Sequence, residues 1–100
     1  MDIKEIQEKV VKISDTYAKN YGINRTDDWY ILKLQEELGE LTQNYLSFTS
    51  RGRDRGKSEN EIKKEFAYEL SDLIGQTLLI ANHFDIDIEK ALEDKWYKYL

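Results

Sequence analysis

Five acidic residues are grouped in two short motifs whose spacing suits metal chemistry. Glu36, Glu37 and Glu40 form the first motif, and Glu69 and Asp72 form the second. Within each motif, carboxylates stand three residues apart, which places them on one face of a helix. Carboxylates held close together repel one another strongly unless a cation lies among them. The spacing therefore predicts a divalent metal site built by two helices.

The residue types around these motifs narrow the choice of metal. Ligation by carboxylate oxygens alone suits a hard cation, so we expect Mg²⁺, with Mn²⁺ as a substitute. The chain has no cysteine, which excludes a thiolate site. A di-iron bundle centre uses Glu-x-x-His pairs, and the single histidine, His83, is expected to be structural. Phosphate oxygens commonly occupy the remaining positions around such cations.

Helical phase separates the five carboxylates from one another. At about 100° per residue, Glu37 lies on the flank of the apolar stripe of its helix, and Glu40 lies farther out on the same flank. Glu69 falls inside the apolar sector of the later helix, and Asp72 lies at its edge. We therefore expect these four residues to converge as ligands and Glu36 to face solvent beside them. A solvated acidic face is the alternative, because acidic residues are abundant in this chain.

The first half of the chain reads as two helices. Apolar residues recur at helical spacing from Ile3 onward, and Gly22 suits the C-terminal cap of this first helix. Residues 26–28, Thr-Asp-Asp, supply N-cap chemistry for a second helix. The second helix carries the first acidic motif and fades near Ser50.

The second half reads as two further helices. Ser58 and Glu61 have the spacing of a capping box, which opens a third helix that reaches Phe84. Residues 85–87 mark a turn, and a fourth helix then runs to Leu100. The third helix, of about 26 residues, is roughly 39 Å long, whereas a compact 100-residue chain has a radius of gyration near 13 Å. We therefore expect one domain, residues 1–100, with an all-α fold completed by oligomerisation.

Composition limits the partners and the location of the protein. The net charge of −5 argues against nucleic-acid binding, which needs a basic surface. No apolar run approaches the roughly 20 residues that span a bilayer, and the N-terminus lacks the apolar stretch of a signal peptide. We expect a cytoplasmic protein that binds neither membranes nor nucleic acid.

The two acidic motifs together resemble the signature of the MazG-like all-α nucleoside triphosphate pyrophosphohydrolases, Glu-Glu-x-x-Glu followed by Glu-x-x-Asp. Here they are Glu-Glu-Leu-Gly-Glu at 36–40 and Glu-Leu-Ser-Asp at 69–72, and the resemblance covers roughly residues 28–100. It implies a four-helix MazG-like bundle in which the four carboxylates named above bind Mg²⁺. The implied reaction converts a (deoxy)nucleoside triphosphate to the monophosphate and pyrophosphate, with Glu37 or Glu40 as ligand or catalytic base.

The resemblance also suggests substrate-binding residues. Lys95 matches a lysine of the last helix that contacts phosphates in the family, and Lys98 is a second candidate beside it. Some relatives have an asparagine four residues after that lysine, where this chain has Tyr99. Trp29 and Phe48 are candidates to stack on a base, and packing in the core or in an interface is the alternative.

Between the second and third helices lies a basic loop. Residues 51–58 carry Arg51, Arg53, Arg55 and Lys57. These side chains are able to reach phosphates as a mobile lid, but we favour a solvated loop, because charge runs usually face water.

The resemblance further implies assembly as a dimer or dimer of dimers and a nucleotide-pool housecleaning role with dCTP-type or dATP-type preference. Two other functions stay open. One is a non-catalytic helical interaction module. The other is a dUTP/dUDP hydrolase of the related all-α type, which usually has a longer chain.

Overall fold

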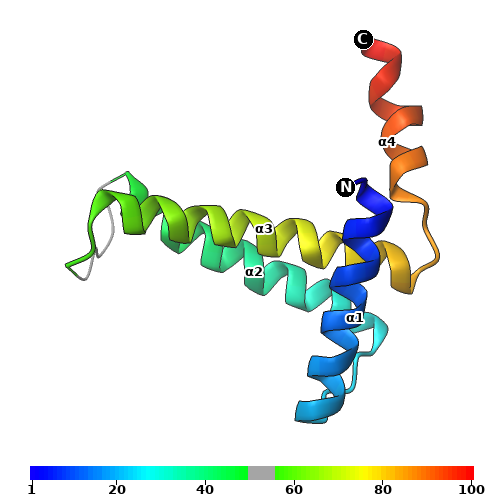
Figure 1. Cartoon of the computed structure of the whole chain (residues 1–100), viewed down its shortest axis with the longest axis horizontal. Helices are drawn as coiled ribbons and strands as arrows, with labels where there is room; N and C mark the ends of the chain where they lie inside the picture. Colours follow the sequence, from blue (N-terminus) through cyan, green and yellow to red (C-terminus); the bar gives the residue numbers. More distant parts are fainter. Residues whose placement is uncertain (50–55) are drawn as a thin grey trace.

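The computed structural model describes residues 1–49 and 56–100, and these ranges consist mainly of helices (Figure 1). No strand occurs in either range, so the prediction of an all-α chain is confirmed. No helix in these ranges is both long and apolar enough to cross a bilayer. The elements are α1 (Ile3–Tyr21), α2 (Asp27–Phe48), α3 (Glu59–His83), α4 (Ile88–Trp96) and the 3₁₀ turn η1 (Tyr97–Tyr99).

Cap residues expected from the sequence close α1 and open α2 and α3. Gly22 closes α1 in the left-handed conformation, at φ 62°, which glycine adopts without steric penalty. The Thr26 hydroxyl accepts a hydrogen bond from the Trp29 backbone N–H at 3.1 Å and opens α2. Ser58 accepts from the Glu61 backbone N–H at 3.2 Å and opens α3. These local signals fix where each helix starts.

The α2 and α3 helices form a long antiparallel pair, and α1 packs across α3 near one end of that pair (Figure 1). The Gln7 side-chain amide donates to the Leu78 carbonyl at 3.0 Å and ties α1 to α3. Gly75 faces Val10 at the same crossing. The buried apolar residues gather at this end of the pair; they are Ala18, Tyr30, Leu78, Leu79 and Ala81.

The α4 helix stands apart from the rest of the chain. The Asp87 side chain accepts from the Lys90 backbone N–H at 3.0 Å and starts the helix, as expected. From there α4 projects away from the α2–α3 pair, and it buries none of its residues (Figure 1). The α-helix ends at Trp96 rather than at Leu100, because its last turn tightens into η1, a common form of helix end.

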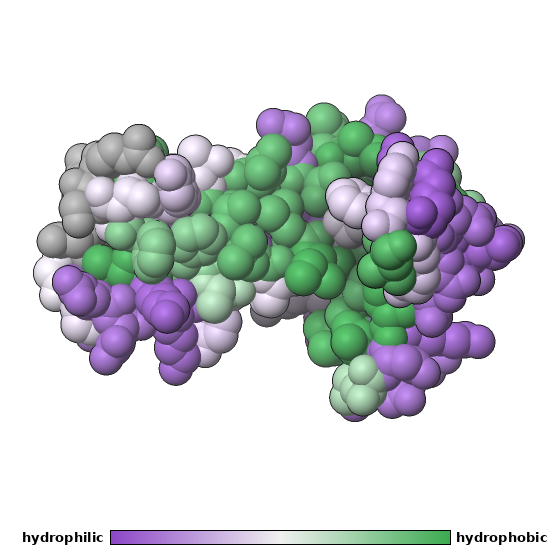
Figure 2. Space-filling view, turned by 90° about the horizontal axis from the view of Figure 1, so that it is seen from above, coloured by the Kyte–Doolittle hydropathy of each residue, from purple (hydrophilic) through white to green (hydrophobic). Residues whose placement is uncertain are grey.

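The chain leaves much apolar surface in water. Its accessible surface is 7977 Å², whereas a compact monomer of this mass exposes about 5,900 Å². The radius of gyration is 15.9 Å, against about 13 Å for a compact chain of this length. Figure 2 shows apolar side chains gathered in a band along the α2–α3 pair. The single chain is therefore an open helical assembly and not a closed bundle.

We predict that Leu78→Ala destabilises the protein by about 2–4 kcal/mol. Leu78 is the most buried of the core residues, at 2% exposure, so the truncation leaves a cavity where α1 crosses α3. Urea unfolding followed by circular dichroism measures the change. Leu100→Ala is the matched control, because Leu100 is fully exposed and the same truncation there should change stability by less than about 0.5 kcal/mol. Equal losses in the two variants would contradict the core described above.

Candidate metal centre

A buried hydrogen bond sets the register of the two helices that carry the acidic motifs. The Gln76 side-chain amide on α3 donates to the Tyr30 carbonyl on α2 at 3.0 Å. Glu37 lies seven residues after Tyr30, and Glu69 lies seven residues before Gln76. Seven residues are two helical turns, or about 10 Å. Because the helices are antiparallel, equal steps from the hydrogen bond bring Glu37 and Glu69 to the same level.

The structure brings Glu37, Glu40, Glu69 and Asp72 together in one acidic cluster. Each residue offers one carboxylate oxygen, and these oxygens all lie within 4.8 Å of one another. Two full negative charges at that separation repel by about 3 kcal/mol at an effective dielectric constant of about 20. Glu36 lies outside the cluster, with its side chain 57% exposed. The four residues that helical phase selected as ligands are the four that meet.

Two oxygens of the cluster fit a bound cation. Glu37 Oε2 and Glu69 Oε2 are buried, and neither has a hydrogen-bond partner. A buried carboxylate oxygen without a partner is costly, since it has lost its hydration without compensation. A hard divalent cation coordinated by carboxylate oxygens would satisfy both atoms. The donor set therefore suits Mg²⁺ or Mn²⁺ at this position.

The protonation of Glu69 reflects the crowding of negative charge. Burial, the nearby carboxylates of Glu40, Asp72 and Glu37, and a hydrogen bond with Glu40 together raise the pKa of Glu69 to about 7. Without a cation, this carboxyl group is therefore partly protonated near neutral pH. A cation in the cluster would favour its ionised form and displace that proton.

The pKa of Glu37 is raised for similar reasons, but a neighbouring lysine opposes the increase. Burial and the charges of Glu40 and Asp72 raise the pKa of Glu37, while the Lys33 ammonium group acts in the opposite direction. Lys33 Nζ lies 3.6 Å from Glu37 Oε1. Glu37 thus presents one oxygen to a lysine and holds the other buried within the cluster.

Lys33 is a neighbour of the cluster that our sequence analysis missed. Its ammonium group also lies 3.4 Å from Glu36 Oε1. Burial alone would lower the pKa of Lys33, but the carboxylates of Glu36 and Glu37 outweigh that effect and raise it. The signal was present in the sequence, because Lys33 precedes Glu36 by three residues and Glu37 by four, the spacings of helical ion pairs.

The structure does not bring the lysines of the last helical segment to the cluster. Lys95 lies in α4 and Lys98 lies in η1, both in the part of the chain that projects away from the α2–α3 pair (Figure 1). Within one chain, the cluster and these two lysines are therefore separate features. A phosphate contact by either lysine stays a prediction. It would require a second subunit that brings its lysine to this cluster.

The two aromatic residues expected to stack on a base lie at opposite ends of α2. Trp29 is in its first turn, with its ring 5.0 Å from that of Tyr30. Phe48 is its last residue, with its ring 5.1 Å from that of Phe66 on α3. Nineteen residues of helix separate them by about 28 Å along the axis. The described contacts of both rings are with neighbouring aromatic rings of the same chain.

Lys57 is the basic side chain of the loop that the structure describes. Of the basic loop, Arg51, Arg53 and Arg55 fall outside the described residues, and Lys57 pairs with Glu65 on α3.

His83 is the last residue of α3. Its Nε2 lies 2.7 Å from Asp27 Oδ1, and its ring stacks on Tyr30 at 4.1 Å between centroids. These contacts tie the start of α2 to the end of α3, the structural role expected for this residue.

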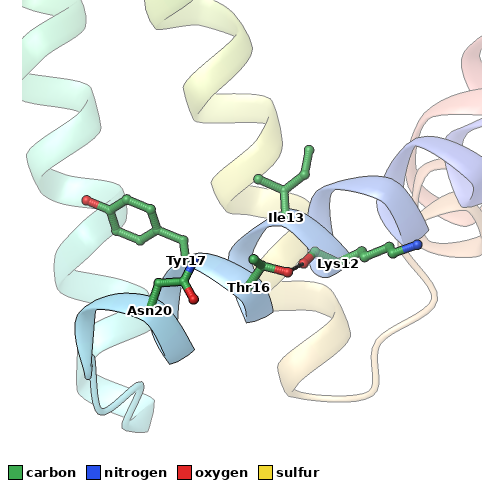
Figure 3. A pocket seen from close by; sticks show the side chains of 5 residues that line it. All are labelled: Lys12, Ile13, Thr16, Tyr17 and Asn20. Carbon is green, nitrogen blue, oxygen red and sulfur yellow. Dashed lines mark hydrogen bonds between the residues drawn. The ribbon is translucent and has the colours of Figure 1, made fainter.

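A second surface feature lies on α1, separate from the acidic cluster. A hollow of about 400 Å³ that is open to solvent is lined by Lys12, Ile13, Thr16, Tyr17 and Asn20. Figure 3 shows these side chains along α1. The Thr16 hydroxyl donates to the Lys12 carbonyl of its own helix at 3.0 Å. The lining has no carboxylate and no histidine.

Comparisons of the chain with protein-family models, with curated proteins and with solved structures gave no match. The function of the acidic cluster therefore has to be inferred from its own geometry and chemistry.

We predict that removing the Glu69 carboxyl group changes the pH dependence of stability in EDTA. The folded state holds the Glu69 proton up to a pKa of about 7, against an ordinary value of 4.5. It therefore binds more protons than the unfolded state in that window, and this residue's contribution to stability falls as pH rises. The Glu69→Gln variant should therefore have a higher free energy of unfolding than the wild type. This difference should be about 2 kcal/mol larger at about pH 8 than at about pH 5.

Urea unfolding at the two pH values measures this difference. Glu36→Gln is the control, since its exposed side chain lies outside the cluster and its effect should be small at both pH values. The same stability gain for Glu69→Gln at both pH values would show that folding does not raise the pKa of Glu69.

Proposed function

We propose that the protein is a Mg²⁺-dependent hydrolase that converts a nucleoside triphosphate, preferably a deoxynucleotide, to the monophosphate and pyrophosphate. The observation that supports this most is the cluster of four carboxylates with two buried oxygens that lack partners. The two motifs that form it have the spacing of the MazG-like pyrophosphohydrolases. We further propose membership of that family and a cytoplasmic role in cleaning the nucleotide pool.

In the proposed reaction, Glu37, Glu40, Glu69 and Asp72 hold the cation. When bound, Mg²⁺ supplies charge neutralisation and orientation for the triphosphate. The oxygen of a water molecule bonds to one of the two phosphorus atoms of the α–β anhydride bridge. The P–O bond between that phosphorus and the bridging oxygen breaks, and the monophosphate and pyrophosphate separate.

A carboxylate of the cluster accepts the proton of the attacking water. Glu37 and Glu40 are the candidates for this base. The crowded cluster would thus provide both the ligands and the base.

We also propose that the protein self-associates as a dimer or dimer of dimers, which completes a four-helix bundle. The α2 helix exposes Ile31, Leu38 and Tyr45 at seven-residue intervals, and α3 exposes Leu70 and Ile74. Residues seven apart lie on one stripe of a helix, the arrangement that helix pairs bury. The surface in excess of a compact chain, about 2,000 Å², matches what each subunit of an obligate dimer commonly buries.

The open apolar surface also favours a second function. A non-catalytic interaction module would use the same exposed residues of α2 and α3 to bind another protein, and it would need no turnover. A dUTP/dUDP hydrolase of the related all-α type is a further alternative, which would cleave diphosphates as well. Nucleotide assays distinguish these proposals.

We predict that the purified protein releases pyrophosphate from at least one of dCTP, dATP, dTTP, dGTP and dUTP with Mg²⁺ and that EDTA abolishes this release. Glu37→Gln and Glu69→Gln should each lower kcat/KM by at least about 100-fold, because each removes a charged oxygen donor from the cation site. A coupled pyrophosphate assay measures the rates.

Glu36→Gln serves as the matched control and should keep activity within about threefold of wild type, as expected for an exposed ion-pair partner. No release from any of these triphosphates would favour the interaction module. Cleavage of dUDP would instead favour the dUTP/dUDP hydrolase. Full turnover in Glu69→Gln would refute the proposed ligand set.

We predict that Ile74→Asp shifts the protein from an oligomer toward a monomer. Ile74 is 61% exposed in the single chain, and a charge there would be buried in the proposed interface. Light scattering after size exclusion gives the mass of each species. Leu100→Asp is the control for an added charge at an exposed apolar residue outside the stripe. A monomeric wild type would rule out the proposed self-association.

A further inference from the structure

Lys33 lies on the same stripe of α2 as two residues of the acidic cluster. Lys33, Glu37 and Glu40 are spaced at i, i+4 and i+7, which aligns them over two helical turns. The Lys33 side chain is 33% exposed, so its ammonium group lies at the edge of the cluster and reaches solvent. It is therefore placed to meet a ligand that approaches the cluster from water.

The ion pairs of Lys33 are loose. Its Nζ lies 3.4 Å from Glu36 Oε1 and 3.6 Å from Glu37 Oε1. Strong ammonium–carboxylate hydrogen bonds are about 2.7–2.9 Å long, so neither carboxylate binds the ammonium group tightly. A lysine held this way changes partners with little loss, and its flexible stem lets the charge move.

The charge balance of the cluster favours such an exchange. Four carboxylates and one divalent cation still leave net negative charge, which repels a polyphosphate. Among the residues that the structure describes, Lys33 is the one cation whose ion pair includes a member of the cluster. Lys95 and Lys98 lie in the segment that projects away from α2 and α3. Among the described residues, Lys33 is therefore the cation placed at the cluster to offset this repulsion.

We propose that Lys33 is a substrate-binding residue whose ammonium group leaves Glu37 and binds a phosphate oxygen of the incoming polyphosphate. The exchange occurs when Glu37 becomes a ligand of the divalent cation, because the cation then neutralises the carboxylate that Lys33 had paired with. This proposal rests on the proposed function, and it assigns to α2 both cation ligands and a phosphate contact.

The test separates binding of the cation from binding of the anion. Mn²⁺ affinity is measured by electron paramagnetic resonance without nucleotide, and affinity for inorganic pyrophosphate is measured by calorimetry on the Mn²⁺-loaded protein. Lys33→Met should weaken pyrophosphate binding by about tenfold or more, while Mn²⁺ affinity stays equal or rises. Lys33→Arg, which keeps the charge, should stay within about threefold of wild type in both measurements.

Lys90→Met is the matched control, because Lys90 also pairs with a carboxylate at i+4 but lies on α4, and it should bind both ions like wild type. Circular dichroism verifies that each variant is folded. Wild-type pyrophosphate affinity in Lys33→Met would overturn the proposal. A loss of Mn²⁺ affinity in that variant would overturn it too, since Lys33 would then position Glu37. A wild type that binds neither ion would instead refute the proposed function itself.

Discussion

Like charges held at the contact between two helices are the constraint on which this structure depends. The α2–α3 pair could have closed around apolar residues along its whole length, but at its middle it buries oxygens of Glu37 and Glu69 beside two further carboxylates. Such an arrangement lowers stability unless protons or a cation compensate for it. A fold that keeps this arrangement gives up stability at a place where ligand binding would restore it.

The rest of the chain supplies what is needed to hold that contact together. The core lies to one side of the acidic cluster, where α1 crosses α3 and where Leu78 and Tyr30 are buried. The Asp27–His83 pair ties the helix ends on that side. The cluster therefore lies next to a firmly packed region without being part of it.

Much of this arrangement was predictable from the sequence, because its signals are local. Capping residues such as Thr26 and Ser58 mark helix starts through hydrogen bonds to backbone N–H groups within three residues. The selection of cluster members depended on the helical phase of the carboxylates relative to the apolar stripes of their two helices. The ion pairs of Lys33 follow the same local rule, because Glu36 and Glu37 lie three and four residues after it.

The parts that the sequence did not predict depend on contacts between distant elements. The α4 helix starts at a clear N-cap, Asp87. No local sequence signal, however, predicts which surface this helix packs against. The position of Lys95 relative to the cluster follows from that surface and therefore was not predictable from spacing. The end of α4 at Trp96 is a similar case, since the choice between an α and a 3₁₀ turn involves small energy differences.

The hydrogen bond from Gln76 to the Tyr30 carbonyl has a consequence for how the sequence can change over evolution. It fixes the register of α2 and α3 at the packed end of the pair, and Glu37 and Glu69 lie two helical turns away. Insertions or deletions in the connection between the helices leave that alignment untouched. Deletion of a single residue between Tyr30 and Glu37 would instead rotate the carboxylate by about 100°. Length variation should therefore be tolerated in the connection and excluded from these two helical segments.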